Sequence, residues 1–125
     1  MITICDEEFD QTVERALAEL PDEFATHLKN VVIEVRPRPD AAFQREHDVP
    51  GDLLGLYAGV PLDEQGYRRE HAGPLPDRIY IFRENLCAAC ASREELTREI
   101  RVTLLHEIGH HFGLDEDRLA ELGYD

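Results

Sequence analysis

The chain of 125 residues has 27 acidic and 13 basic side chains, which give a formal net charge of −14. Its length suits one domain with one core, and an apolar fraction of 42% is enough for that core to form. The acidic excess repels nucleic-acid phosphates and anionic lipid surfaces. We therefore expect a single domain over residues 1–125 that binds neither nucleic acid nor a membrane.

The N-terminal sequence and the cysteines favour a cytoplasmic protein. Residues 1–8 become acidic at once and lack the basic start and apolar core of a signal peptide. No apolar run approaches the roughly 20 residues that span a bilayer. The three cysteines, Cys5, Cys87 and Cys90, are an odd number, which without a signal peptide favours reduced thiols.

Apolar spacing predicts two helices and a strand at the start of the chain. The first helix covers about residues 7–20, where four apolar side chains recur at helical spacing: Phe9, Val13, Leu17 and Leu20. Pro21 ends it, and a shorter helix is expected over residues 22–29. Residues 31–36 are rich in β-branched side chains and predict a strand.

Prolines and glycines divide the middle of the chain. Residues 37–52 are polar and rich in proline, so we expect a long loop there. Residues 53–60 predict a strand, in which Gly55 and Gly59 mark places where another element packs closely.

A second polar loop is expected over residues 61–77, and a second alternating strand follows it over residues 78–83. The alternation puts Ile79 and Ile81 on one side of this strand and Tyr80 and Phe82 on the other.

A capping box predicts the start of a long helix. Ser92 is followed three residues later by Glu95, so the helix should begin at Arg93. Gly113 suits the left-handed position that ends a helix, which gives about 20 residues and roughly 30 Å of length. Its inner face is apolar: Leu96, Ile100, Leu104, Leu105, Ile108 and Phe112.

The end of this helix has the spacing of a zinc site. His106 and His110 are four residues apart, so their imidazoles lie one turn apart on one face and can bind one Zn²⁺. Glu107, rotated by about 100° from His106, lies beside the metal. It can act as the general base that takes a proton from zinc-bound water and passes it to a leaving amine.

A catalytic zinc usually has three protein ligands. Gly113 turns the chain back, and Glu116 follows as the expected third ligand, with Asp117 and Asp115 as alternatives. Nickel, cobalt or manganese can also occupy sites of this kind. A last short helix is expected over residues 116–122.

Several stretches resemble the small bacterial zincin-like metallopeptidase family. They are Val102–Leu119, with the histidine–glutamate motif, and the middle segments Leu53–Tyr57, Gly59–Leu62 and Pro76–Tyr80. The resemblance covers most of the chain from about Val31 onward. It implies a few-stranded sheet packed against an active-site helix.

With the N-terminal helix, we expect an α+β, minimal zincin-like fold with a small mixed sheet. The resemblance implies that His106, Glu107 and His110 have the family roles. The family's third-ligand position falls on Glu116, where an aspartate is common. The expected function is zinc-dependent hydrolysis of peptide bonds in a peptide or protein substrate.

An alternative of another class is a metal-binding or peptide-binding module with little turnover. Few residues follow the motif, and a methionine turn under the metal is lacking, which favours this alternative. Tyr57, Tyr80 and Tyr124 could each polarise a carbonyl, although packing explains each of them better.

A bound peptide would pair with an exposed strand edge, either residues 53–57 or residues 78–82. Cys87 and Cys90 could form a redox or metal pair, and their position just before a helix would favour a lowered thiol pKa. We nevertheless expect two ordinary loop thiols, or an adventitious disulfide, over a functional pair.

Overall fold

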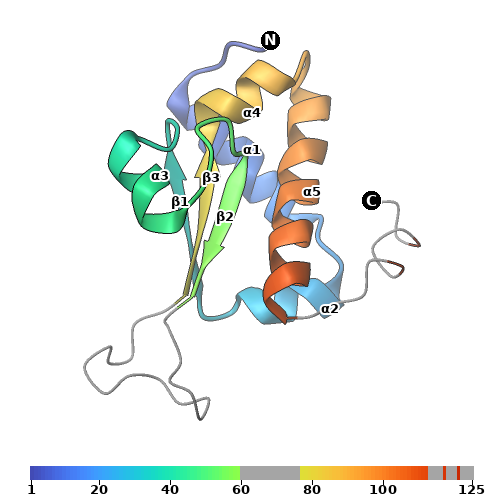
Figure 1. The fold of residues 1–125 in the computed structure, drawn as a ribbon. Coiled ribbons are helices and arrows are strands. Elements are labelled where there is room, and N and C mark those ends of the chain that lie inside the picture. The colour runs from blue at the N-terminus through green and yellow to red at the C-terminus, as the bar shows by residue number, and fades with distance from the viewer. Residues whose placement is uncertain (60–76, 113–116, 118–120, 122–125) are drawn as a thin grey trace.

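The computed structural model describes residues 1–59, 77–112, 117 and 121. Nine elements follow one another in this part of the chain (Figure 1). They are α1 (Asp6–Ala18), α2 (Asp22–Ala25), the 3-10 turn η1 (Thr26–Leu28), β1 (Val31–Arg36), α3 (Ala41–His47), β2 (Gly55–Ala58), β3 (Asp77–Phe82), α4 (Arg83–Ala89) and α5 (Arg93–Phe112).

The three strands form one mixed sheet in the order β1-β3-β2. β1 runs parallel to β3, and Ile33 lies opposite Ile79. β2 runs antiparallel to β3, and Tyr57 also lies opposite Ile79, on the other side. β3 is therefore the central strand, while β1 and β2 are the two edges. The mixed sheet with its helices confirms the expected α+β fold.

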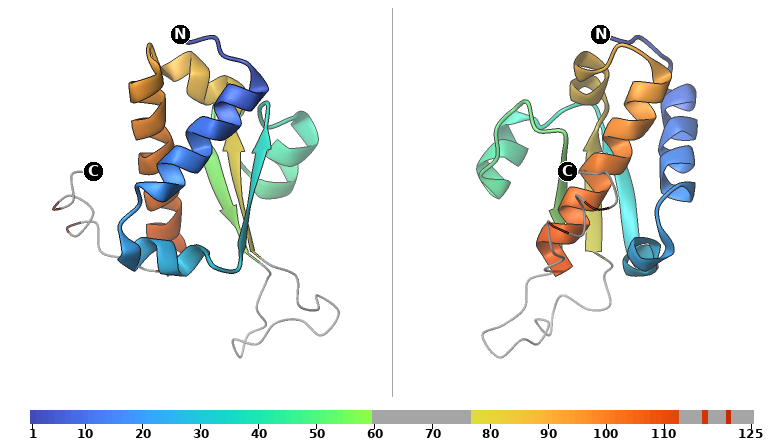
Figure 2. Two further views of the ribbon diagram at one scale, coloured as in Figure 1. Left: turned by 180° about the vertical axis from the view of Figure 1, so that it is seen from behind. Right: turned by 90° about the vertical axis from the view of Figure 1, so that its right-hand side faces the viewer.

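The two faces of the sheet are covered by different helices. α1 and α5 lie on one face and α3 on the other (Figure 2, right). Ile79 and Ile81 of β3 are fully buried on the α1–α5 face, as predicted. They join a core formed mainly by α1 and α5: Phe9, Val13, Ala16, Leu96, Ile100, Leu104, Leu105 and Ile108.

A smaller aromatic cluster occupies the α3 face. The ring of Phe43 meets those of Tyr80 and Phe82 edge-on, at centroid distances of 4.9 and 5.4 Å. The Arg36 guanidinium lies over the Tyr80 ring at 4.7 Å. The alternation of β3 is thus confirmed on both faces, and Tyr80 has a packing role.

Helix α5 begins at Arg93, as predicted from the capping box. The Ser92 hydroxyl accepts a hydrogen bond from the Glu95 amide at 3.1 Å. The Glu95 carboxylate accepts a hydrogen bond from the amide of Ala91, at 3.2 Å, whereas a capping box would have it bind the amide of Ser92. Two amides at the start of the helix region are therefore satisfied locally.

Two helices were not predicted. The expected loop over residues 37–52 is wrong in part, because α3 forms within it. Asp40 caps α3 by accepting a hydrogen bond from the Phe43 amide at 2.8 Å, and Asp48 ends it in the left-handed conformation, at φ 55°. The other helix, α4, follows β3 directly, and its buried Leu86 joins the core.

The predicted loop over residues 61–77 lies outside the described residues except for Asp77, which begins β3. Most of the last predicted helix, residues 116–122, lies outside them too. Among the residues that are described, no helix combines the length and the apolar character needed to cross a bilayer.

Candidate active site at the end of α5

The predicted metal ligands His106 and His110 lie on one unbroken helix. α5 runs for 20 residues, from Arg93 to Phe112, so the two residues are one turn apart on the same face. The His106 side chain is half-buried. The side chain of His110 lies outside the described part of the structure. The backbone of α5 therefore has the spacing that a shared metal requires.

The side chain of Glu107 lies against the sheet edge. Its Oε2 atom accepts a hydrogen bond from the backbone N–H of Tyr57 in β2, at 3.2 Å. These two residues are 50 positions apart in the sequence. The predicted general base is thus held beside strand β2 by a backbone amide, which sequence reasoning missed because a backbone donor leaves no side-chain signal.

The Tyr57 amide points away from β3, on the outer edge of the sheet. Leu54 pairs inward, since its carbonyl accepts a hydrogen bond from the Phe82 amide at 3.0 Å. In an antiparallel pair the residues alternate between inward and outward hydrogen-bonding groups. The backbone groups of Gly55 and Tyr57 therefore both face outward, while those of Leu54 and Leu56 face β3.

Strand β2 and helix α5 come into close contact at Gly55. A Cβ atom on Gly55 would lie 2.6 Å from Cγ2 of Thr103 and 2.9 Å from the carbonyl oxygen of Tyr80. Neither distance is compatible with a side chain at this position. The predicted close approach at Gly55 is therefore confirmed, and its partner is the buried Thr103.

The distance between the contacting residues along β2 nearly equals the distance between their partners along α5. Gly55 and Tyr57 are two residues apart on a strand, or roughly 6.6–6.8 Å. Thr103 and Glu107 are four residues apart on a helix, or about 6 Å. Because these spacings nearly agree, packing Gly55 against Thr103 also places the Tyr57 amide opposite the Glu107 carboxylate. Packing at Gly55 thus positions the candidate base.

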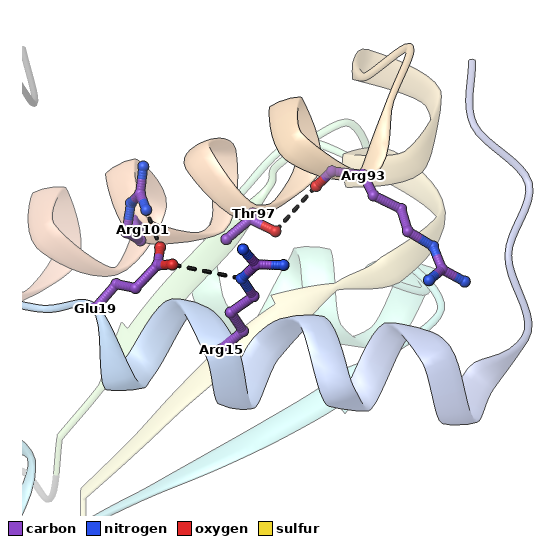
Figure 3. A network of polar contacts seen from close by, with 5 residues as sticks. All are labelled: Arg15, Glu19, Arg93, Thr97 and Arg101. Carbon is purple, nitrogen blue, oxygen red and sulfur yellow. Dashed lines mark hydrogen bonds and ion pairs between the residues drawn. The ribbon is translucent and has the colours of Figure 1, made fainter.

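The first half of α5 is fixed to α1 by ion pairs. Glu19, just after α1, contacts Arg101 of α5 and also binds Arg15 Nε at 3.4 Å (Figure 3). Glu8 of α1 pairs with Arg93 at the start of α5. α5 is therefore fixed to α1 along its first half and lies against β2 along its second.

The hydroxyl of Tyr57 binds the start of the central strand. It donates a hydrogen bond to Oδ2 of Asp77 at 2.7 Å. This bond joins β2 to β3 beside the candidate site. It supports the structural role expected for Tyr57 over a direct role in polarising a carbonyl. Tyr124 lies outside the described residues.

A model of the zincin-like metallopeptidase family matches residues 28–124 of the chain. The chain belongs to this family. No curated protein matches the zincin-like chain significantly. A solved structure, a conserved hypothetical protein from Thermus thermophilus, is similar at a TM-score of 0.57 and 22% identity. The similarity covers 97% of the zincin-like chain and all of the other chain, and it supports the fold.

Membership of the zincin-like family implies zinc binding. The described residues are compatible with that role, because His106 lies one turn before His110 on α5 and Glu107, the candidate base, lies next to it in the sequence. Glu116 and the alternative Asp115 lie outside the described residues, while Asp117 is exposed. Within the described residues no group of three His, Cys, Asp or Glu side chains is arranged to hold a metal ion.

The two cysteines near α4 are not activated thiols. Cys87 lies within α4, and Cys90 follows it as a buried residue, so the expected pair of loop thiols is wrong for Cys87. Burial raises the pKa of Cys87, and it raises that of Cys90 to about 11. The expected lowering of the thiol pKa is therefore wrong. Both thiols are free, and Cys90 belongs to the core.

Proposed function

We propose that this zincin-like chain is a zinc-dependent peptidase with Glu107 as general base. One observation carries the proposal beyond the family match. The Glu107 carboxylate is bound to the outward-facing amide of an edge strand, at 3.2 Å. An extended peptide that added to this edge would lie beside the candidate base.

The strand arrangement supports β2 as the strand that binds substrate. β3 is paired on both sides, by β1 and by β2, so its backbone has no open edge. Of the two alternatives that the sequence left open, β2 therefore remains. Gly55 presents its backbone groups outward next to Tyr57, and a substrate strand would pair there.

In this proposal His106 and His110 hold the metal, with Glu116 as third ligand and Asp117 or Asp115 in its place as alternatives. A Zn²⁺ ion held there would supply a Lewis acid that makes water nucleophilic near neutral pH. Glu107 removes a proton from the attacking water and delivers it to the amine of the leaving product. The Tyr57 amide keeps the Glu107 carboxylate at the substrate edge during both transfers.

The experiment is the substitution Glu107→Gln, which keeps the shape of the side chain and removes its basicity. General acid–base catalysis contributes roughly 100- to 10,000-fold, so we expect peptide hydrolysis to fall by at least about 100-fold. Zinc content should stay at that of the wild type. Hydrolysis is measured on a quenched-fluorescent peptide library, and zinc by elemental analysis of protein purified without an affinity tag.

His106→Ala is the complementary variant, since it should lose both zinc and hydrolysis. Wild-type activity in Glu107→Gln would refute the mechanism. Stoichiometric zinc in the wild-type protein with no hydrolysis of any library peptide would favour the alternative, a metal-binding or peptide-binding module.

A further inference from the structure

The second edge of the sheet lies on the side away from the candidate site. β1 pairs with β3 along one edge over six residues. On its other edge, no strand among residues 1–59 and 77–112 pairs with it. Val32 in this strand is 40% exposed, which is unusual for a large apolar side chain of this protein.

A groove of about 510 Å³ runs between this edge and α1. Figure 2 (left) shows α1 passing beside β1 on this side of the molecule. Its apolar lining comes from both elements: Val13 and Leu17 of α1, and Val32, Ile33 and Val35 of β1. An open strand beside an apolar groove is the arrangement to which an extended segment adds as a further strand.

The rim of the groove is acidic. Asp10 and Glu14 of α1 line it and are exposed, and neither forms an ion pair with a described residue. The third acidic residue there, Glu34, is already paired with Arg36 and Arg78. Among the residues that the structure describes, no Lys or Arg lines the groove. A ligand that adds to β1 therefore meets uncompensated negative charge.

We propose that the outer edge of β1 binds an extended basic segment of a partner protein. Its backbone pairs with β1, and its face toward α1 carries both apolar side chains, which enter the groove, and Lys or Arg side chains, which meet Asp10 and Glu14. A second copy of this chain is a poor occupant, since it would bring the same carboxylates and another net charge of −14 against this surface. The site lies across the sheet from β2, so it does not depend on the peptidase proposal.

The test uses two synthetic eight-residue peptides, one of the repeat Lys-Thr-Val-Thr and one of the repeat Glu-Thr-Val-Thr, so that the charged residues and the valines share one face of the strand. Binding to the wild-type chain is measured by calorimetry, and the site is located from amide shifts in ¹⁵N NMR spectra. We expect the lysine peptide to bind at least ten-fold more tightly and to shift the amides of β1 rather than those of β2. The double variant Asp10→Lys/Glu14→Lys should weaken it at least ten-fold.

The matched control is Glu46→Lys/Asp52→Lys, which changes net charge equally at exposed positions outside the groove. It should bind the lysine peptide within about two-fold of the wild type. Equal weakening in both double variants would show non-specific attraction and overturn the proposal. Shifts confined to β2, or a wild-type dimer in sedimentation that uses β1, would overturn it as well.

Discussion

The two edge strands of the sheet differ in how closely a helix packs against them. At β2, helix α5 comes so close that Gly55 has no room for a Cβ atom, and the Glu107 carboxylate binds the outward amide of Tyr57. At β1, a groove of about 510 Å³ separates the strand from α1. Helix α5 thus packs directly on β2 at Gly55, whereas the outer edge of β1 stays open beside its groove.

The forces at the two edges differ in kind. The contact of Gly55 in β2 with α5 is steric, and pH and salt do not change it. At β1 the carboxylate of Glu34 pairs with Arg36 of the same strand and with Arg78 in the neighbouring strand β3. A substitution that changes the size of a side chain should therefore disturb β2, while one that removes a charge should disturb β1.

The largest effect is expected from Gly55→Ala. The new methyl group would lie 2.6 Å from Thr103 Cγ2 and 2.9 Å from the Tyr80 carbonyl oxygen, and a backbone atom cannot give way cheaply. Overpacking of this kind costs about 1–3 kcal/mol, and we expect the upper half of that range. Urea unfolding followed by circular dichroism measures it. Hydrolysis should fall as well, because the Tyr57 amide moves relative to Glu107.

Gly51→Ala is the control for this substitution, since its Cβ would meet only the flexible end of Gln44, at 3.2 Å. Its free energy of unfolding should change by less than about 0.5 kcal/mol. Adding Thr103→Ser to Gly55→Ala removes Cγ2 and should restore part of the loss. If Gly55→Ala is as stable as the wild type, the close contact between β2 and α5 is not real.

A smaller effect is expected from Glu34→Gln at the open edge. Burial alone would raise the pKa of Glu34, but hydrogen bonds and charges from Arg36 and Arg78 outweigh it and hold that pKa below its ordinary value. A lowered pKa stabilises the fold above the unfolded value, and this contribution is lost as the pH falls through the folded pKa. Near pH 7 the variant should lose about 1 kcal/mol.

The stability difference between wild type and Glu34→Gln should depend on pH. The difference in stability between wild type and Glu34→Gln should be complete above about pH 5 and shrink below about 4.5, where protonated Glu34 resembles glutamine. Urea titrations across this range measure it, because urea leaves ionic strength unchanged. A difference that stays constant down to about pH 3 would show that the ion pairs do not stabilise β1.

Local sequence patterns predicted the elements that carry the site. The capping box at Ser92 gives the start of α5, and helical periodicity places His106 and Glu107 on it without any long-range information. Gly55 was predicted to mark a close approach, and Thr103 proves to be the partner. The glycine shows that something lies close, but nothing in the sequence says which element it is.

The features that the sequence did not predict depend on weak local patterns or on contacts between residues far apart in the sequence. The cap at Asp40 signals α3, but Pro37 and Pro39 beside it favoured a loop. In α4 no side chain caps the start, so only its composition could have predicted it. The order of the strands depends on pairing β1 with the distant β3, which no local pattern contains. The contact of Glu107 with a backbone amide follows from that order.

The smallest effect is expected from Val32→Thr at the open edge. The substitution keeps the shape of the side chain and exchanges a methyl group for a hydroxyl at a position that is 40% exposed, where water can bind the new group. The free energy of unfolding should therefore change by less than about 0.5 kcal/mol in urea titrations. A loss above about 1 kcal/mol would mean that this edge is covered in solution.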